Sequence, residues 1–242
     1  MNCQSVNKAD QRAANGYVEP WGRVPGSGVQ MGTAFTKAVR ALFSNGGARA
    51  ADAVEKYFFS AGNGFTGSQF ELVVDIDHPN EITARDVVAV SMLGVQVPER
   101  PARWLLGDGR EQVRSLLEKV PPDIDVWAPA ADRLLAETGP LWQLWDLLGE
   151  ASWPTQRAKN GLGRTKRSKL LAAKRPRLVP VIDKIVEAQL GSTGDYWQAF
   201  QEALGDEPLR LEIERATKTA PARVSLLRRL DVVAWMAGKG FV

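Results

Sequence analysis

The sequence of 242 residues contains one cysteine, Cys3, and one histidine, His78. A single cysteine excludes an intrachain disulfide and a cysteine-based zinc site. A single histidine gives little support to a histidine metal cage or a Ser-His-Asp triad. His78 lies in a polar turn next to Asp75 and Asp77, where we interpret it as a turn residue rather than a metal ligand. We therefore expect no metal ion and no cofactor.

The sequence also lacks any apolar run close to the ~20 residues that a membrane-spanning helix requires. Residues 1–10 are polar and do not form the apolar core of a signal peptide. With 44% hydrophobic residues the chain can build a core, and its length permits one large domain or two small ones. These features favour a cytoplasmic, reduced protein that binds no membrane, and we expect it to be a monomer.

Apolar residues recur at the spacing of amphipathic helices through most of the chain. Thr83 is a predicted helix cap, with Asp86 as its capping-box partner. Trp142, Trp145 and Leu148 form a stripe that is typical of a packed core. The sequence therefore predicts an all-α fold. The predicted helices span residues 33–43, 48–59, 84–93, 98–106, 110–119, 128–136, 140–148, 154–160, 164–174, 183–190, 195–204, 209–218 and 224–236.

Two segments depart from the helical pattern. Residues 1–32 are rich in Asn, Gly, Pro and Ser, and we interpret them as an N-terminal arm. Residues 70–76 alternate partly and are rich in β-forming residues, which predicts at most a short strand or hairpin. We expect residues 33–242 to form one mainly α-helical domain, with two helical lobes flanking a cleft.

Positive charge is concentrated in one part of the chain, although the net charge is only +3. Between Arg157 and Lys184 there are ten Lys or Arg residues and one acid, Asp183. This span carries +9, which leaves −6 for the rest of the chain. A solvated helix face normally mixes both signs, so the cluster favours a footprint for a polyanion. The ten cations are residues 157, 159, 164, 166, 167, 169, 174, 175, 177 and 184.

A glycine pair begins the densest part of this basic segment. Gly161 and Gly163 flank Leu162, and glycine adopts backbone angles that other residues avoid, which permits a tight turn with exposed N–H groups. The predicted helix from Arg164 to Lys174 begins at this turn. Its N-terminus is surrounded by basic side chains and is therefore a ready site for a phosphate group.

The Gly-Leu-Gly motif at residues 161–163, the helix after it and Pro-Val-Ile-Asp at residues 180–183 together resemble the helix-hairpin-helix DNA glycosylases. That family has a Gly-hydrophobic-Gly hairpin, a helix, a proline and a catalytic aspartate that begins the next helix. Asp183 follows Gly161 by 22 positions, which fits the spacing of its adenine-excising branch. Residues 168–183 are also similar to a poorly characterised actinobacterial branch. The resemblance places the hairpin motif at residues 154–183.

The resemblance implies that Asp183 is the catalytic carboxylate of a DNA glycosylase. Cleavage of an N-glycosidic bond gives the sugar oxocarbenium-like positive charge, which a nearby carboxylate stabilises. The target base must first be rotated out of the duplex into a pocket. From the residues alone, the alternative is that Asp183 only caps the helix that follows it. The residues expected to contact double-stranded DNA are Gly161, Gly163, Arg164, Thr165, Lys166, Arg167 and Lys169.

The sequence departs from the family pattern in three ways. The iron–sulfur cluster of some members requires four cysteines and is therefore excluded. Thr165 occupies the position of the lysine that attacks the sugar in bifunctional members, which implies a monofunctional enzyme that leaves an abasic site, although the adjacent Lys166 keeps the bifunctional route open. Arg167 replaces a small residue under the hairpin, so either the hairpin is splayed or Arg167 points at a phosphate.

Other functions remain open at this stage. Glycine hairpins also occur in DNA-binding proteins without catalytic activity. A nuclease would need clustered acids for magnesium, and Asp75 and Asp77 are the only close acidic pair before an apolar helix. A basic helical scaffold that binds no DNA is a further alternative. Trp153 is a candidate wedge or a helix staple. The excised base could belong to DNA repair or to defence against phages with hypermodified DNA.

Overall fold

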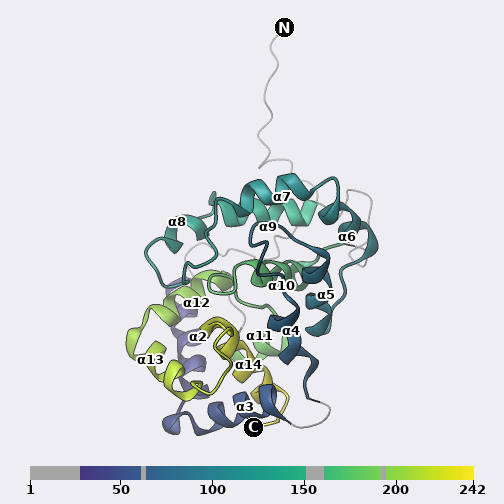
Figure 1. Ribbon diagram of the computed structural model, residues 1–242. Helices are drawn as coiled ribbons and strands as arrows, with labels where there is room; N and C mark the ends of the chain where they lie inside the picture. Colours follow the sequence, from purple (N-terminus) through teal and green to yellow (C-terminus); the bar gives the residue numbers. More distant parts are fainter. Residues whose placement is uncertain (1–27, 61–63, 151–160, 192–194) are drawn as a thin grey trace.

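The computed structural model describes residues 28–60, 64–150, 161–191 and 195–242. Every regular element in these residues is a helix and none is a strand, which confirms the predicted all-α fold (Figure 1). The predicted helix 154–160 and Trp153 lie outside the described residues. None of the described helices is long and apolar enough to cross a bilayer.

Helices from the two ends of the described chain pack together as a first group (Figure 1). In this group α2 contacts α11 and α12, and α13 contacts α12 and α14. The C-terminal helix α14 also contacts α2, α3 and α11, and most of its residues are buried. The bounds are α2 Gly28–Leu42, α3 Ala48–Phe59, α11 Lys184–Leu190, α12 Tyr196–Gly205, α13 Glu207–Ala216 and α14 Leu226–Gly238, with a 3-10 turn η1 at Asn45–Gly47.

The middle of the chain forms a second group of helices. Here α7 contacts α6 and α9, α8 contacts α9, and α4 contacts α5. One continuous hydrophobic core runs through both groups, and it includes the fully buried Phe35 of the first and Leu117 of the second. The bounds are α4 Phe70–Val73, α5 Ala84–Met92, α6 Glu99–Leu106, α7 Arg110–Leu117, α8 Ala131–Leu135 and α9 Pro140–Glu150, with a 3-10 turn η2 at Thr66–Gln69.

The helix α10, Arg164–Lys174, lies between the two groups in Figure 1 and contacts α5 and α9. Its bounds agree with the predicted helix, but its surroundings do not agree with a helix that presents basic side chains to solvent. Every residue from Arg167 to Lys174 is buried. Because a buried charge is costly unless it is paired, the cations of α10 must have partners within the protein.

The segment 70–76 forms no strand, and its first four residues form the short helix α4 instead. Phe70 and Val74 lie one helical turn apart and pack with Ala89 of α5 and Ala173 of α10, which favours the short helix α4. A helix of four residues is too short to display its period in the sequence.

Two predicted boundaries also need correction. The helix α2 begins at Gly28, which removes five residues from the predicted arm 1–32. The helix α9 continues to Glu150, past the predicted end at residue 148. By contrast, the capping box between Thr83 and Asp86 is confirmed. The core stripe is confirmed at Trp145 and Leu148, which are buried, whereas Trp142 is partly buried.

Candidate active site

The glycine turn before α10 is only partly as predicted. Gly161 and Leu162 are buried, and Gly163 is the exposed cap residue of α10. The φ of Gly163 is −61°, which any residue adopts, so the expected need for glycine angles is wrong at this position. A Cβ added to Gly163 would have no atom within 4 Å. The backbone at the start of α10 is therefore exposed and is not covered by neighbouring side chains.

The first three side chains of α10 lie near the protein surface. Arg164 forms an ion pair with Glu187 of α11, which ties the hairpin helix to the helix that Asp183 begins. Thr165 and Lys166 are half-buried, and Lys166 Nζ lies 3.4 Å from the carbonyl oxygen of Gly161. Thr165 and Lys166 thus remain partly accessible to an external phosphate, whereas Arg164 already has a carboxylate partner.

Arg167 does not point outward from the start of α10. Its side chain is buried against α9, where Nη1 donates to the carbonyl of Trp145 at 3.0 Å. The guanidinium also lies over the Trp145 ring, 4.3 Å from the ring centroid, in a cation–π contact. Gly149 makes room for it, because a Cβ there would lie 2.5 Å from Nη1 of Arg167. The structure therefore places Arg167 against α9 rather than at the surface, where it was expected to contact DNA.

Replacement of Gly149 by alanine should destabilise the protein by about 1–3 kcal/mol, because the added methyl group overpacks the slot that holds Arg167. The free energy of unfolding measured in urea tests this. Gly205, near the end of α12, is a matched control, since a Cβ there meets nothing within 4 Å. Gly205→Ala should be neutral or stabilising. Equal effects of the two substitutions would contradict the assigned role of Gly149.

Lys169 is buried and points toward Asp183 rather than toward solvent. Its Nζ donates to the carbonyl of Leu93 at 2.8 Å and lies 3.5 Å from Oδ2 of Asp183. Burial lowers the pKa of Lys169, and the charge of Asp183 offsets part of that effect. Lys169 is therefore a partner of the candidate catalytic acid, and it does not lie at the surface position that we expected for a phosphate anchor.

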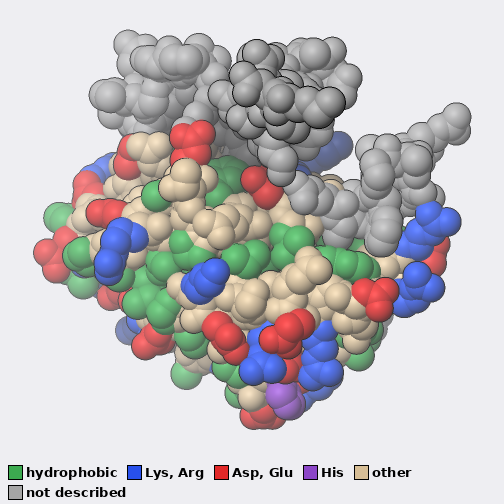
Figure 2. Space-filling model, turned by 90° about the horizontal axis from the view of Figure 1, so that it is seen from above, with side chains coloured by type: hydrophobic (Ala, Val, Ile, Leu, Met, Phe, Trp, Pro, Cys, Tyr) green, Lys and Arg blue, Asp and Glu red, His purple; other side chains and the backbone are tan. Residues whose placement is uncertain are grey.

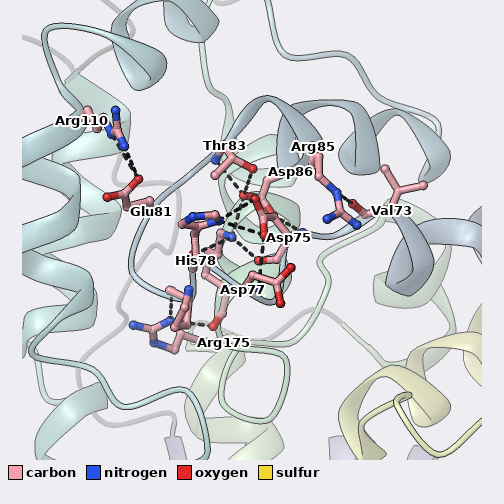
Figure 3. A network of polar contacts seen from close by, with 12 residues as sticks. Val73, Asp75, Asp77, His78, Glu81, Thr83, Arg85, Asp86, Arg110 and Arg175 are labelled. Atoms are coloured by element: carbon pink, nitrogen blue, oxygen red, sulfur yellow. Dashed lines mark hydrogen bonds and ion pairs between the residues drawn. The ribbon is translucent and has the colours of Figure 1, made fainter.

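Lys174 and Arg175 hold a loop of the second group. Lys174 pairs with the fully buried Asp86 at 2.6 Å and donates to the carbonyls of Asp75 and His78. Arg175 is also fully buried, and burial lowers its pKa to about 10. Figure 3 shows Arg175 below the turn that carries Asp75 and His78. The backbone carbonyls that accept from Arg175 belong to Leu117, Val120, Pro79 and Lys174.

The predicted electrostatic footprint is therefore much smaller than the sequence indicates. Of its eight cations in the described residues, four are buried, and the exposed Arg177 pairs with Asp125. On the face seen in Figure 2, Lys and Arg side chains lie in separate groups with acidic side chains nearby, and a band of hydrophobic and uncharged side chains crosses between them. The cations of this segment serve mainly to bind α10 to its neighbours.

The two carboxylate oxygens of Asp183 have different partners. Oδ1 accepts from the backbone N–H of Ile185 at 2.9 Å, so Asp183 caps α11 as the alternative interpretation predicted. Oδ2 faces Lys169, and the side chain is 24% exposed, so the carboxylate is neither sealed in the core nor free on the surface. The other polar support at this place is Ser168, which accepts from the N–H of Ile182 and fixes the extended backbone before Asp183.

A cavity of about 380 Å³ lies beside Asp183, where the two groups of helices meet. One wall is aromatic. Tyr57 of α3 and Phe65 stack with ring centroids 5.3 Å apart, and Trp235 of α14 packs edge-on against both. The end of α5 around Leu93 also lines the cavity. A cavity with flat aromatic walls and a few polar groups is typical of a small-molecule site.

Buried charges from α14 also line this cavity. Asp231 pairs with Arg228, and both are buried. Arg228 further donates to Glu71 at 3.0 Å, to the Tyr57 hydroxyl at 2.7 Å and to the carbonyl of Gly67 at 3.1 Å. Burial raises the pKa of Asp231 to about 6, although Arg228 opposes the effect. The cavity therefore contains two carboxyl groups in different surroundings.

Sequence reasoning missed Asp231, Arg228 and the aromatic wall. A signal for the charged pair exists, because Arg228 and Asp231 lie three residues apart in the predicted helix 224–236, in which Arg229 is the only other charged residue. Charged residues at that spacing share one face of a helix, and within an apolar helix that face must be buried with its own partners. Lys239 was also missed; it is exposed and lies at this cavity.

The acids that a nuclease would use do not form a metal site. Asp75 accepts from Nδ1 of His78 and from the N–H of Asp77, and these contacts close the turn seen in Figure 3. Hydrogen bonds from Thr83 and His78 outweigh the burial of Asp75 and lower its pKa. No group of three or more His, Cys, Asp or Glu that could hold a metal ion occurs in the part of the chain that the structure describes.

The fold and the site together define an all-helical protein with a charged, aromatic-walled cavity at the junction of two helix groups. A family model described as "Family of unknown function (DUF6308)" matches residues 50–238, and the chain belongs to this family. No curated protein matches the chain, and no solved structure matches it.

Proposed function

We propose that this protein is a DNA glycosylase that hydrolyses the N-glycosidic bond of a modified or damaged base in double-stranded DNA. The observation that carries the proposal is the position of Asp183: its carboxylate lines a cavity of about 380 Å³, which is within the range of about 300–1,000 Å³ for small-molecule sites. The sequence resemblance to helix-hairpin-helix DNA glycosylases adds support, because the aspartate after the proline is their catalytic residue.

The chemistry follows from the surroundings of Asp183. An extruded nucleotide would place its base in the cavity, against Tyr57, Phe65 and Trp235, and its sugar at the carboxylate. The carboxylate would stabilise the positive charge on the sugar as the base leaves and accept a proton from the attacking water. Since α11 holds Oδ1 through its N–H group, the carboxylate is already oriented before substrate binds.

The contacts to DNA come from the outward part of the hairpin in this proposal. Gly163 offers an exposed backbone at a helix N-terminus, which attracts phosphate. Thr165 and Lys166 lie beside it, and Lys239 lies at the cavity. Contacts of this kind position DNA without reading its sequence. Lys169 supports the site from inside instead, and Arg167 binds α10 to α9.

We further propose that the enzyme is monofunctional and leaves an abasic site. Thr165 cannot form a Schiff base, and the Lys169 amine is engaged by Leu93 and Asp183 as a hydrogen-bond donor. Borohydride should therefore trap no covalent protein–DNA adduct during turnover. An adduct that disappears in Lys169→Ala or in Lys166→Ala would contradict this and would identify the attacking amine.

The function is tested by incubating the protein with a panel of DNAs that contain oxidised, alkylated, deaminated or phage-type hypermodified bases, and by assaying for abasic sites. We expect cleavage of the glycosidic bond in at least one class, and that class separates a role in repair from a role in defence. Binding to DNA without abasic sites on any member would instead favour a non-catalytic helix-hairpin-helix DNA-binding protein, in which Asp183 serves only as a cap and as the partner of Lys169.

A further inference from the structure

Asp231 is the second carboxyl group of the cavity, and nothing in the proposed hydrolysis has yet used it. It projects from α14, is 2% exposed and lines the same cavity as Asp183. Its Oδ2 is bound by Arg228, which fixes the carboxyl in one orientation. Arg228 is itself held by Glu71, Tyr57 and Gly67, so the whole support of Asp231 is built from buried groups.

We propose that Asp231 recognises the extruded base, and that its carboxyl hydrogen-bonds to an unprotonated ring nitrogen of that base and donates a proton to it. This rests on the proposed glycosylase function. The ligand class is a neutral nitrogen heterocycle of purine type that stacks on the wall of Tyr57, Phe65 and Trp235. A base that is already cationic, such as an N7-alkylated purine in DNA, needs no such proton in order to leave.

The reaction is then balanced with the substrate, one water molecule and the two aspartates alone. As the C1′–N bond breaks, its electron pair goes to the base, and the proton of Asp231 moves to a ring nitrogen, so the base leaves neutral. Water adds to C1′, and its proton goes to Asp183. Exchange with solvent restores the proton of Asp231 and removes that of Asp183. The two acids thus divide the roles of proton donor and charge stabiliser, as carboxyl pairs in unlike environments do in glycoside hydrolysis.

The buried surroundings of Asp231 favour its protonated form. Burial raises the pKa of this carboxyl to about 6, so a substantial fraction is protonated just below neutral pH. The titratable and charged groups that face Asp231 come from several helices. The cations among them favour the ionised carboxylate, and Asp183 favours the protonated carboxyl. These groups are Tyr57 of α3, Lys169 of α10, Asp183 before α11, Tyr196 of α12 and Arg228 of α14.

Free heterocycles test the proposal without DNA. Purine and indole are bicycles of the same size, but only purine has an unprotonated ring nitrogen that accepts a proton. By calorimetry on the full chain, purine should bind about tenfold more tightly than indole at pH 5, and this preference should decline as the pH rises through about 6. Asp231→Leu should abolish the preference, whereas Asp231→Asn, which still donates a hydrogen bond but does not titrate, should make purine binding independent of pH.

Asp206→Asn is the matched control, because it also removes one carboxylate, but Asp206 caps α13 and neither lines the cavity nor contacts Arg228. It should leave the preference for purine unchanged. Equal binding of purine and indole to the unaltered protein, or a preference that is unaffected by pH, would overturn the proposal even if the variants do not fold. Purine binding with the expected pH dependence, together with no excision from any DNA, would support this site and refute the glycosylase function.

Discussion

Replacement of Asp183 by asparagine is expected to reduce base excision by about 10²–10⁴-fold, because it removes the charge that stabilises the sugar in the transition state. Asparagine caps helices about as well as aspartate does, so the contact with the N–H of Ile185 should survive. The affinity for DNA should therefore change little, whereas the free energy of unfolding should fall, because the buried Lys169 loses its charged partner. Single-turnover excision, urea denaturation and DNA binding measured on the same preparation separate these quantities.

Asp206 provides the control for this variant. It caps α13 through the N–H of Leu209 at 3.0 Å, pairs with Arg40 and does not line the cavity. Asp206→Asn thus removes the same charge from the same kind of cap, and it should leave excision unchanged. If Asp183→Asn retained full activity, the catalytic role of Asp183 would be refuted. A loss of activity in both variants would indicate a general effect on stability.

Replacement of Lys174 by methionine is expected to cost about 3–5 kcal/mol of unfolding free energy. The Lys174 ammonium and the Asp86 carboxylate are both buried and lie 2.6 Å apart, so the variant leaves an uncompensated charge on Asp86. It also leaves the carbonyls of Asp75 and His78 without this donor. The midpoint and slope of urea denaturation, followed by circular dichroism, measure the loss.

Lys184→Met is the comparison, since Lys184 is an exposed cation of the same basic segment. Its effect should stay within about 0.5 kcal/mol. In the double variant Lys174→Met with Asp86→Asn, both charges are absent, and part of the loss should be recovered. A surface role for Lys174 would instead give two small effects and no coupling with Asp86.

The positions of the helices could be predicted from the sequence because their signals are local. Apolar spacing and capping residues such as Thr83 and Asp183 lie within the helices that they define, and the bounds of α3 and α10 agree with the predicted ones. The short helix α4 could not be predicted, since its two anchoring residues, Phe70 and Val74, pack against helices that are distant in the sequence.

The burial of the basic residues could not be predicted, because the sequence gives the charges but not their partners. The carbonyls that bind Arg175 come from two segments, at residues 79 and 117–120, and they approach only when the chain folds. The prediction for Asp183 was of a different kind. Its spacing from the glycine turn can be read locally, whereas Lys169, Asp231 and the aromatic wall beside it come from separate helices.

The links from Lys174 and Arg175 to earlier parts of the chain also impose an order on its assembly. During synthesis the carbonyls of residues 75–80 and 117–120 leave the ribosome long before the two cations that satisfy them. Until α10 has emerged, those acceptors and the carboxylate of Asp86 depend on water. We therefore expect the second group of helices to complete its folding only after α10 has left the ribosome.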